Sequence, residues 1–297
     1  MSKIKILFGL MKAPFLALTP ACVAVGVGTA YWQTHEINWL SIVLITMGAV
    51  SAHICVNAFN EYFDFRSGLD SKTQRTPFSG GSGALPSHPE MEKTAFYLSW
   101  ITFAVTAVIG FYFVWLHGWL LLPLGLFGLF LLVAYTTWVV YHPILCLLAP
   151  GLGFGVMMVM GTNFCLTGTY SWTSFVASLM PTFLVSNLLL LNQFPDVEAD
   201  QSIQRRHLPI TIGRKRCSII YGVFLLLAYT SVVVGVIIKL LPLFCLIALL
   251  TSVLAWRVYR GTRQNAENIP VLIPFMGINV VINLISPLLL AIGLFIG

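Results

Sequence analysis

The sequence predicts an all-α, polytopic membrane protein with nine transmembrane helices around a central cavity, and three observations lead to this fold class. Hydrophobic residues occupy 58% of the 297 positions and charged residues only 9%, whereas a soluble domain is roughly 45–50% apolar. Apolar stretches of about 20 residues, long enough to cross a bilayer as helices, recur along the whole chain. The basic residues are concentrated in alternate connections between these stretches, as the positive-inside rule requires.

Breaks at polar, glycine and proline residues divide the chain into nine expected spans. Their approximate limits are residues 14–32, 39–63, 93–115, 118–137, 144–168, 172–194, 216–238, 241–259 and 270–296. The connections between them are short, so residues 1–297 are expected to form a single integral-membrane domain. Its two acidic connections lie at about 57–92 and 192–215.

The first span begins within MSKIKILFGLMKAPFLALTP, which carries charges and an apolar run, as a signal peptide does. Lys12 and Pro14 interrupt the apolar run, and no small-residue cleavage site follows it. We therefore interpret this segment as the start of a membrane helix and not as a removed signal peptide.

The charges predict the orientation. With nine spans and the N-terminus on the cytoplasmic side, every basic residue except Lys239 lies on the inner side. Basic loops that face anionic lipid headgroups explain the net charge of +6, so lipid and not nucleic acid is the expected partner of these loops. In a prokaryotic host this membrane would be the cell inner membrane.

Acidic residues gather in two clusters on the same inner side. In NAFNEYFDFRSGLD, which starts at residue 57, Asn57, Glu61 and Asp64 are spaced i, i+4 and i+7, and Asn60 precedes Asp64 by four. If the second span stays helical to about residue 65, these side chains share one face. This face would end a membrane helix at the cytoplasmic surface.

The second cluster is LNQFPDVEADQ, where Asn192, Asp196 and Asp200 repeat every four residues. Pro195 lies inside the repeat and cannot donate to a helical hydrogen bond, so a kink or local break is expected there. Both clusters end an even-numbered span on the same side of the membrane. They can therefore converge on one cavity.

Carboxylate and amide oxygens suit hard cations, above all Mg²⁺, and neighbouring carboxylates repel each other unless a cation neutralises them. Nearby cations supply donors for phosphate groups; they are Arg66, Lys72, Arg75, Arg205 and Arg206. The combination predicts a phosphorylated, lipid-like substrate. The alternative is that interfacial carboxylates sit in headgroup water beside Lys or Arg, but two amide-plus-carboxylate clusters at helical spacing favour a site.

The clusters resemble the motifs of the UbiA superfamily of intramembrane prenyltransferases. The first family motif, NDxxDxxxD, is matched by Asn60 and Asp64, with Glu61 in the second position and Gly68 where the last Asp would stand. The second motif, DxxxDxxxD, is matched with Asn192 in place of its first Asp. The resemblance implies a UbiA-type arrangement of nine helices with both motifs on the cytoplasmic side.

Within the superfamily the chain is most similar to the menaquinone-type branch, the dihydroxynaphthoate polyprenyltransferases. NAFNEYFDFRSGLD departs from the branch pattern NxxNDYxDxxxGxD only at Glu61, and FGVMMVMGTNFCLTG is similar to the branch's FGPxxVxGTxxxxTG. Two departures leave the acceptor open. HPILCLLAPG lacks the carboxylate of the branch's Gly-Leu-Gly-Glu element, and QRTPFSGGSGALP is nearer to the RPxPSG run of other members.

The resemblance implies transfer of a polyprenyl group from its diphosphate to a small aromatic acceptor, with dihydroxynaphthoate expected, in quinone biosynthesis. It implies Mg²⁺ as cofactor, with Mn²⁺ as a substitute. The expected metal ligands are Asn60, Glu61, Asp64, Asn192, Asp196 and Asp200, of which Asp64, Asp196 and Asp200 are the predicted catalytic residues. The expected substrate-binding residues are Asn57, Tyr62, Arg66, Lys72, Arg75, Tyr135, Arg205 and Arg206.

Several alternatives stay open at this point. A UbiA-type enzyme could instead prenylate another aromatic compound or a lipid headgroup, or could cyclise a terpene. A secondary transporter is the alternative from another class, although its charges would lie near the bilayer midplane and not at one face. His53 is either a base or a buried core histidine, and SGGSGALP is either a flexible lid or a plain turn. Prenyl length and oligomeric state are not specified by the sequence.

Overall fold

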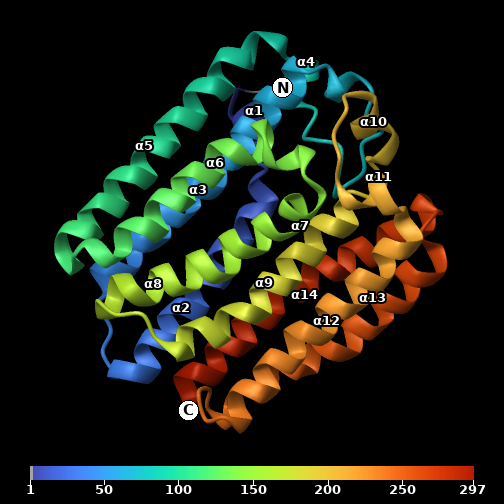
Figure 1. The fold of residues 1–297 in the computed structure, drawn as a ribbon. Coiled ribbons are helices and arrows are strands. Elements are labelled where there is room, and N and C mark those ends of the chain that lie inside the picture. The colour runs from blue at the N-terminus through green and yellow to red at the C-terminus, as the bar shows by residue number, and fades with distance from the viewer. Residues whose placement is uncertain (1–2) are drawn as a thin grey trace.

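The computed structural model describes residues 3–297, so the first two residues of the predicted domain lie outside the described part. Within residues 3–297, nine helices are long and apolar enough to cross a membrane (Figure 1). They are Ala13–Thr34, Trp39–Arg66, Pro89–His117, Trp119–Thr137, Pro143–Thr167, Trp172–Asn192, Arg214–Ile237, Leu243–Asn265 and Ile269–Ile296. Each expected span overlaps one of these helices, and no limit differs by more than six residues. The predicted all-α membrane fold is confirmed.

Six spans consist mainly of one regular α-helix each. These are α3 (Trp39–Arg66), α5 (Glu92–His117), α6 (Leu122–Thr137), α9 (Trp172–Asn192), α12 (Arg214–Ile237) and α14 (Ile269–Ile296). The other three are composite. A 3₁₀ turn precedes α2 (Leu18–Thr34), a π-turn joins α7 (Pro143–Leu152) to α8 (Met158–Thr167), and a 3₁₀ stretch precedes α13 (Ser252–Asn265).

Helix α9 lies at the centre of the molecule and is the most buried span. It packs against α12, α7 and α14, and the largest apolar cluster joins α9 to α12, α13 and α14. Polar side chains inside this cluster bond to one another. Asn187 donates to the Tyr221 carbonyl oxygen at 2.8 Å, and the Tyr221 hydroxyl donates to Asn279 Oδ1 at 2.9 Å. Such pairing is required because lipid offers no hydrogen-bond partners.

The segment from α7 to α8 packs closely against α9 because two glycines remove the side chains between them. A Cβ at Gly155 would overlap the Thr182 hydroxyl, and one at Gly151 would overlap the Ser186 hydroxyl. The π-turn Gly153–Met157 widens the helix between these contacts, a feature that is frequent at functional sites. It places Phe154 in the wall of a cavity.

Short elements gather at one end of the bundle. They are α1 (Lys3–Leu10), α4 (Ala84–Ser87), α10 (Val197–Ser202) and α11 (Leu208–Ile212). Figure 1 shows them beside the N-terminus, at the end opposite to the C-terminus. Helix α1 packs on α4 through Ile6, Leu10, Ala84 and Leu85. Both acidic motifs reach this same end, so the fold brings together two connections that are distant in sequence.

Candidate active site

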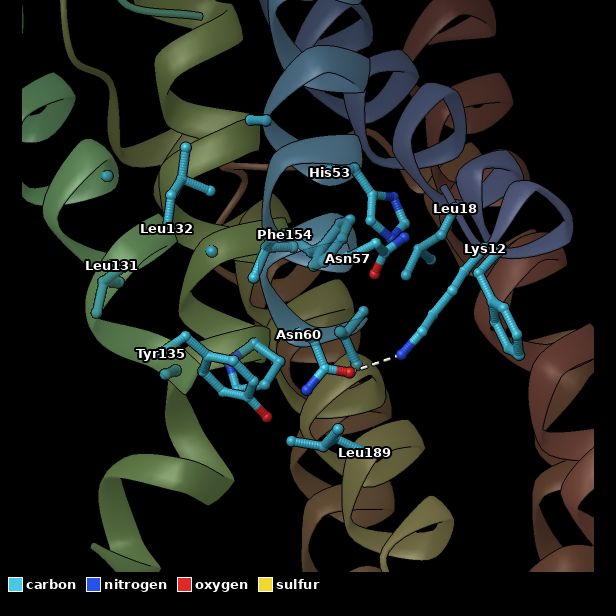
Figure 2. A pocket seen from close by; sticks show the side chains of 18 of the residues that line it. Lys12, Leu18, His53, Asn57, Asn60, Leu131, Leu132, Tyr135, Phe154 and Leu189 are labelled. Atoms are coloured by element: carbon cyan, nitrogen blue, oxygen red, sulfur yellow. Dashed lines mark hydrogen bonds between the residues drawn. The ribbon is translucent and has the colours of Figure 1, made fainter. Parts of the chain in front are cut away.

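A cavity of about 780 Å³ lies between α2, α3, α5, α6, α8 and α9, within the range of roughly 300–1,000 Å³ that is usual for small-molecule sites. Its wall is mostly apolar, with Leu131, Leu132, Phe154 and Leu189 facing the space in Figure 2. The charged groups are confined to one end. They are Lys12, Asp64, Asp70, Asp196, Asp200 and Arg205. The cavity is therefore suited to an apolar molecule with a charged head.

The first acidic motif lines the cavity as one stripe of α3. This helix continues to Arg66, as expected, and His53, Asn57, Asn60 and Asp64 project from it into the cavity. Asn60 Nδ2 donates to Asp64 Oδ2 at 2.9 Å, and Asn57 Nδ2 donates to the Met11 carbonyl oxygen at 2.9 Å. The helical repeat thus aligns amide and carboxylate oxygens on one face.

The second motif follows the break that Pro195 predicts. Helix α9 ends at Asn192, a turn follows, and α10 begins at Val197. Asn192, Asp196 and Asp200 nevertheless all line the cavity. Asn192 Oδ1 and Asp196 Oδ1 are buried and have no hydrogen-bond partner among residues 3–297. These are free oxygen ligands that face the same space as Asp64.

Arg205 joins the two motifs. Its Nη1 donates to Asp200 Oδ1 at 3.0 Å, and its Nη2 donates to Asp64 Oδ1. His207 Nε2 lies 3.0 Å from the other Asp200 oxygen. Burial alone would lower the pKa of Arg205, but the charges of Asp64 and Asp200 raise that pKa above its ordinary value. Arg206 is exposed instead, so Arg205 is the cation that belongs to the site.

Two carboxyl groups that lie beyond the membrane spans hold protons unusually tightly. Burial, followed by the charge of Asp200, raises the pKa of Asp196 to about 7. Burial and the charges of Glu61 and Asp64 raise the pKa of Asp70 to about 7. Repulsion between crowded carboxylates is the common cause after burial. A bound cation would relieve this repulsion, and these groups would then lose their protons more readily.

Glu61 contacts the loop that carries Ser82. It is buried, with 1% of its surface exposed, and it does not line the cavity. Its Oε1 accepts from the Ser82 backbone N–H at 2.9 Å, and its Oε2 accepts from the Ser82 hydroxyl at 2.5 Å. Lys12 Nζ lies 3.3 Å from Oε1. Glu61 differs from the other expected metal ligands in that it does not line the cavity, although the same Lys12 Nζ also contacts Asn60 Oδ1 at 2.6 Å.

Among the expected substrate-binding residues, the structure brings Asn57, Tyr135 and Arg205 to the cavity wall. Five others lie outside this wall: Tyr62, Arg66, Lys72, Arg75 and Arg206. Arg66 Nη1 donates to the Tyr62 hydroxyl at 2.9 Å, and Arg66 Nε lies 3.8 Å from Glu92 at the start of α5. Both side chains are thus on the face of α3 that is turned toward α5, outside the wall of the cavity.

The other three residues outside the wall, Lys72, Arg75 and Arg206, are exposed cations. The Arg75 guanidinium lies against Gly83, where a Cβ would approach it to 2.8 Å. Lys72 and Arg206 are exposed on connecting segments. The sequence indicates that cations lie near the motifs, but it does not specify the direction of each side chain.

Four residues of the polar end are absent from the set that the motifs predict: Lys12, Asp70, Ser82 and His207. Lys12 Nζ donates to Asn60 Oδ1 at 2.6 Å, as Figure 2 shows. The sequence indicates Lys12 through its position, because a lysine that interrupts an apolar span requires a polar partner. Asp70 is the last residue of NAFNEYFDFRSGLD, and the sequence leaves open whether it belongs to the site; His207 follows Asp200 by seven residues. Nothing in the sequence indicates the contact of Ser82 with Glu61.

The chemical type of these oxygen groups is suited to a hard cation such as Mg²⁺. Asn60, Asp64, Asn192, Asp196 and Asp200 offer amide and carboxylate oxygens from α3, from the end of α9 and from α10 with the turn before it, and the orphaned oxygens of Asn192 and Asp196 need a partner. Mg²⁺ uses one or two carboxylates and fills its other positions with water and phosphate oxygens. Among the described residues, no three acidic, His or Cys side chains are close enough to form a complete metal cage. The set therefore fits a metal shared with a phosphorylated substrate.

Comparison with known proteins gives a consistent result. The UbiA prenyltransferase family matches residues 18–296. The 1,4-dihydroxy-2-naphthoate octaprenyltransferase of Bacillus subtilis (strain 168) is 27% identical over 220 residues, covering 73% of this chain and 69% of that protein.

Solved structures show the same fold. A UbiA homolog from Aeropyrum pernix K1 has a TM-score of 0.73 at 16% identity, over 96% of this chain and 98% of that one. A UbiA homolog from Archaeoglobus fulgidus, bound to DMAPP and Mg²⁺, has a TM-score of 0.60 at 13% identity, over 97% of this chain and 99% of that one. Because the family match extends over almost the whole sequence, this chain belongs to the UbiA prenyltransferase family and is an integral-membrane prenyltransferase.

Proposed function

We propose that this prenyltransferase moves a polyprenyl group from its diphosphate to a small aromatic acceptor of the dihydroxynaphthoate kind, with Mg²⁺ as cofactor. The convergence of Asp64, Asp196 and Asp200 at the charged end of a large apolar cavity is the observation that carries the proposal. The name of the Bacillus subtilis relative supports the acceptor class and a role in menaquinone synthesis. The Archaeoglobus fulgidus homolog, which holds DMAPP with Mg²⁺, supports the donor and the metal.

Five residues would hold the metal: Asn60, Asp64, Asn192, Asp196 and Asp200. When bound, Mg²⁺ supplies positive charge to the departing diphosphate, and Mn²⁺ is expected to substitute because it accepts the same oxygen ligands. Glu61 is omitted from this set because, unlike these five residues, it does not line the cavity.

The residues of the chain position the reacting groups. Arg205 holds the carboxylates of Asp64 and Asp200 in fixed positions, and its guanidinium adds positive charge beside the leaving group. The apolar wall binds the prenyl tail and excludes water from the reacting carbon. Tyr135 and Phe154 face the space next to the motifs. Their ring faces can stabilise an allylic cation without reacting with it.

The charge distribution supports a cytoplasmic N-terminus and a site at the cytoplasmic surface of the membrane, which is the inner membrane in a prokaryotic host. The donor's tail would then enter from the lipid while the acceptor arrives from the aqueous side. We place these functions in one domain over residues 1–297.

One experiment tests the acceptor. Purified protein in lipid nanodiscs is incubated with radiolabelled polyprenyl diphosphate, Mg²⁺ and a panel of acceptors, including none. Labelled product with dihydroxynaphthoate above all other acceptors supports the proposal. Turnover without an acceptor would indicate a cyclase, and product with a lipid headgroup would indicate another transferase of the family. Movement of an intact substrate across the bilayer without turnover would indicate a transporter.

A further inference from the structure

A glycine-rich loop lines the charged end of the cavity. Residues 76–82 are part of the cavity wall, and Gly80, Gly81 and Gly83 have φ angles of 82°, 71° and 71°. This left-handed region suits glycine, but such residues also lose the most conformational entropy on folding. The first part of the loop is held by its own hydrogen bonds between Thr76 and Ser79. The glycine-containing part that follows, residues 80–83, is stabilised by contacts with neighbouring segments.

Glu61 supplies the charged contact with this part of the loop. The carboxylate accepts two hydrogen bonds from Ser82, one from the backbone and one from the hydroxyl. The Ser82 hydroxyl in turn accepts from the Ala84 N–H at 3.1 Å, at the start of α4. Hydrogen bonds to an ionised carboxylate are about twice as strong as neutral ones. One buried side chain of α3 therefore fixes the loop at the point where it enters α4.

The N-terminal segment completes this contact. Lys12 lies 3.3 Å from Glu61 Oε1 and compensates its buried charge. The Lys12 backbone is in the left-handed region at φ 48°, a strained conformation that persists only where surrounding contacts impose it. A Cβ at Gly9 would lie 3.1 Å from Ala84 Cβ and 3.5 Å from Ser82 Oγ, so α1 also packs directly on the loop. Three segments thus meet at one carboxylate.

The length of the side chain explains why Glu61 reaches this position. The first family motif has Asp at this place, and Glu carries its carboxylate one methylene further from α3. At about 100° per residue, position 61 also points to one side of the stripe formed by Asn57, Asn60 and Asp64. The carboxylate therefore extends past the cavity wall and reaches Ser82. Asp at this position would be too short to keep both contacts without movement of the loop.

We propose that Glu61 is a positioning residue that holds the loop 76–83 over the diphosphate end of the cavity, and is not a metal ligand. The role of the loop rests on the proposed prenyl transfer, but its attachment to Glu61 does not. Ser79 and Gly80 of this loop line the same cavity as Asp196. By holding the loop, Glu61 would position the part of the cavity wall that faces the diphosphate.

The first test is limited proteolysis, which needs no turnover. Trypsin can cut after Lys72 and Arg75, at the exposed start of the loop. Glu61→Ala should be cut about tenfold faster than wild type, the change expected when charge-assisted hydrogen bonds that hold a loop are lost. Glu61→Asp should fall in between, and Ser82→Ala should show a smaller increase because its backbone contact remains. Glu90→Gln, which changes an exposed carboxylate 3.1 Å from His88 Nδ1, is the matched control and should behave as wild type.

The second test separates positioning from metal binding. Glu61→Gln and Glu61→Ala should raise the KM for polyprenyl diphosphate several-fold, with kcat and the Mg²⁺ concentration for half-maximal turnover close to wild type. Asp196→Asn, which removes a proposed ligand, should raise the Mg²⁺ requirement in the same assay. Glu61→Asp should not restore the wild-type KM, although Asp is the residue of the family motif.

The outcomes are distinct. Equal tryptic cleavage of Glu61→Ala and wild type would overturn the attachment of the loop. A raised Mg²⁺ requirement in Glu61→Gln, with unchanged cleavage, would show that Glu61 is a metal ligand. If wild type fails to turn over any prenyl diphosphate, the proposed function fails, and the cleavage rates still decide whether Glu61 holds the loop.

Discussion

Replacing Arg205 with alanine should destabilise the protein more than any other change of a single cation. The Arg205 side chain is 10% exposed and pairs with Asp64 and Asp200, which are 11% and 8% exposed. Removing it leaves two buried carboxylates without the guanidinium charge, although Asn60 still donates to Asp64 and His207 still contacts Asp200. Breaking a buried ion pair by removing one partner costs about 3–5 kcal/mol. At roughly 2 °C or more per kcal/mol for a chain of this size class, the apparent Tm should fall by about 6 °C or more.

The assay is thermal unfolding in detergent with EDTA, at one scan rate for all variants. Arg206→Ala is the matched control, because this neighbour is exposed and its loss should change stability by about 0.5 kcal/mol or less. Arg205→Lys should recover part of the stability, since it keeps the charge but not the two-point contact. If Arg205→Ala and Arg206→Ala both have an apparent Tm close to that of wild type, the bridge between the two motifs does not form and the reasoning is refuted.

Three further predictions follow from the same site. Turnover should be lost in EDTA and restored by Mg²⁺ or Mn²⁺ but poorly by Ca²⁺, which prefers more ligands at longer distances; full turnover in chelator would contradict the metal's role. Asp64→Asn and Asp196→Asn should each retain less than about a tenth of wild-type turnover, since a lost charge at the site costs several kcal/mol, while circular dichroism shows intact helices. In EDTA, the unfolding free energy should rise as the pH falls from 8 to 5. The folded protein takes up protons at Asp70 and Asp196 near pH 7, whereas the unfolded chain takes them up only at a pH of about 3.9. Asp196→Asn should make this rise smaller, and an unchanged slope in that variant would contradict the assignment.

Much of the fold is predictable from the sequence because hydropathy and helix length decide it. The spans follow from apolar runs bounded by polar, glycine and proline residues, and Pro195 correctly marks the break between α9 and α10. The largest error in a limit is at the eighth span. It continues to Asn265 because the basic residues after Trp256 belong to the same helix as it leaves the apolar region. A prediction from hydropathy alone ends the span near the first of these charged residues.

The site is predictable only where one helix determines it. Asn57, Asn60 and Asp64 share a face because of the helical repeat, which the sequence contains. Arg66 fits the charge pattern equally well, but it lies toward α5 because the packing of neighbouring helices fixes how α3 is rotated. The approach of Lys12 to Asn60 depends on the path of the N-terminal segment across the end of the bundle. Such contacts arise from tertiary structure, and no local pattern specifies them.

The most direct measurement is the stoichiometry of the reaction in nanodiscs, with doubly labelled polyprenyl diphosphate and dihydroxynaphthoate. One diphosphate should be released for each prenylated aromatic product, only when Mg²⁺ is present, and both products should fall below about a tenth of the wild-type amount with Asp64→Asn or Asp196→Asn. Diphosphate release that continues in EDTA, or that exceeds aromatic product in the presence of acceptor, would contradict metal-assisted prenyl transfer at the two converging motifs.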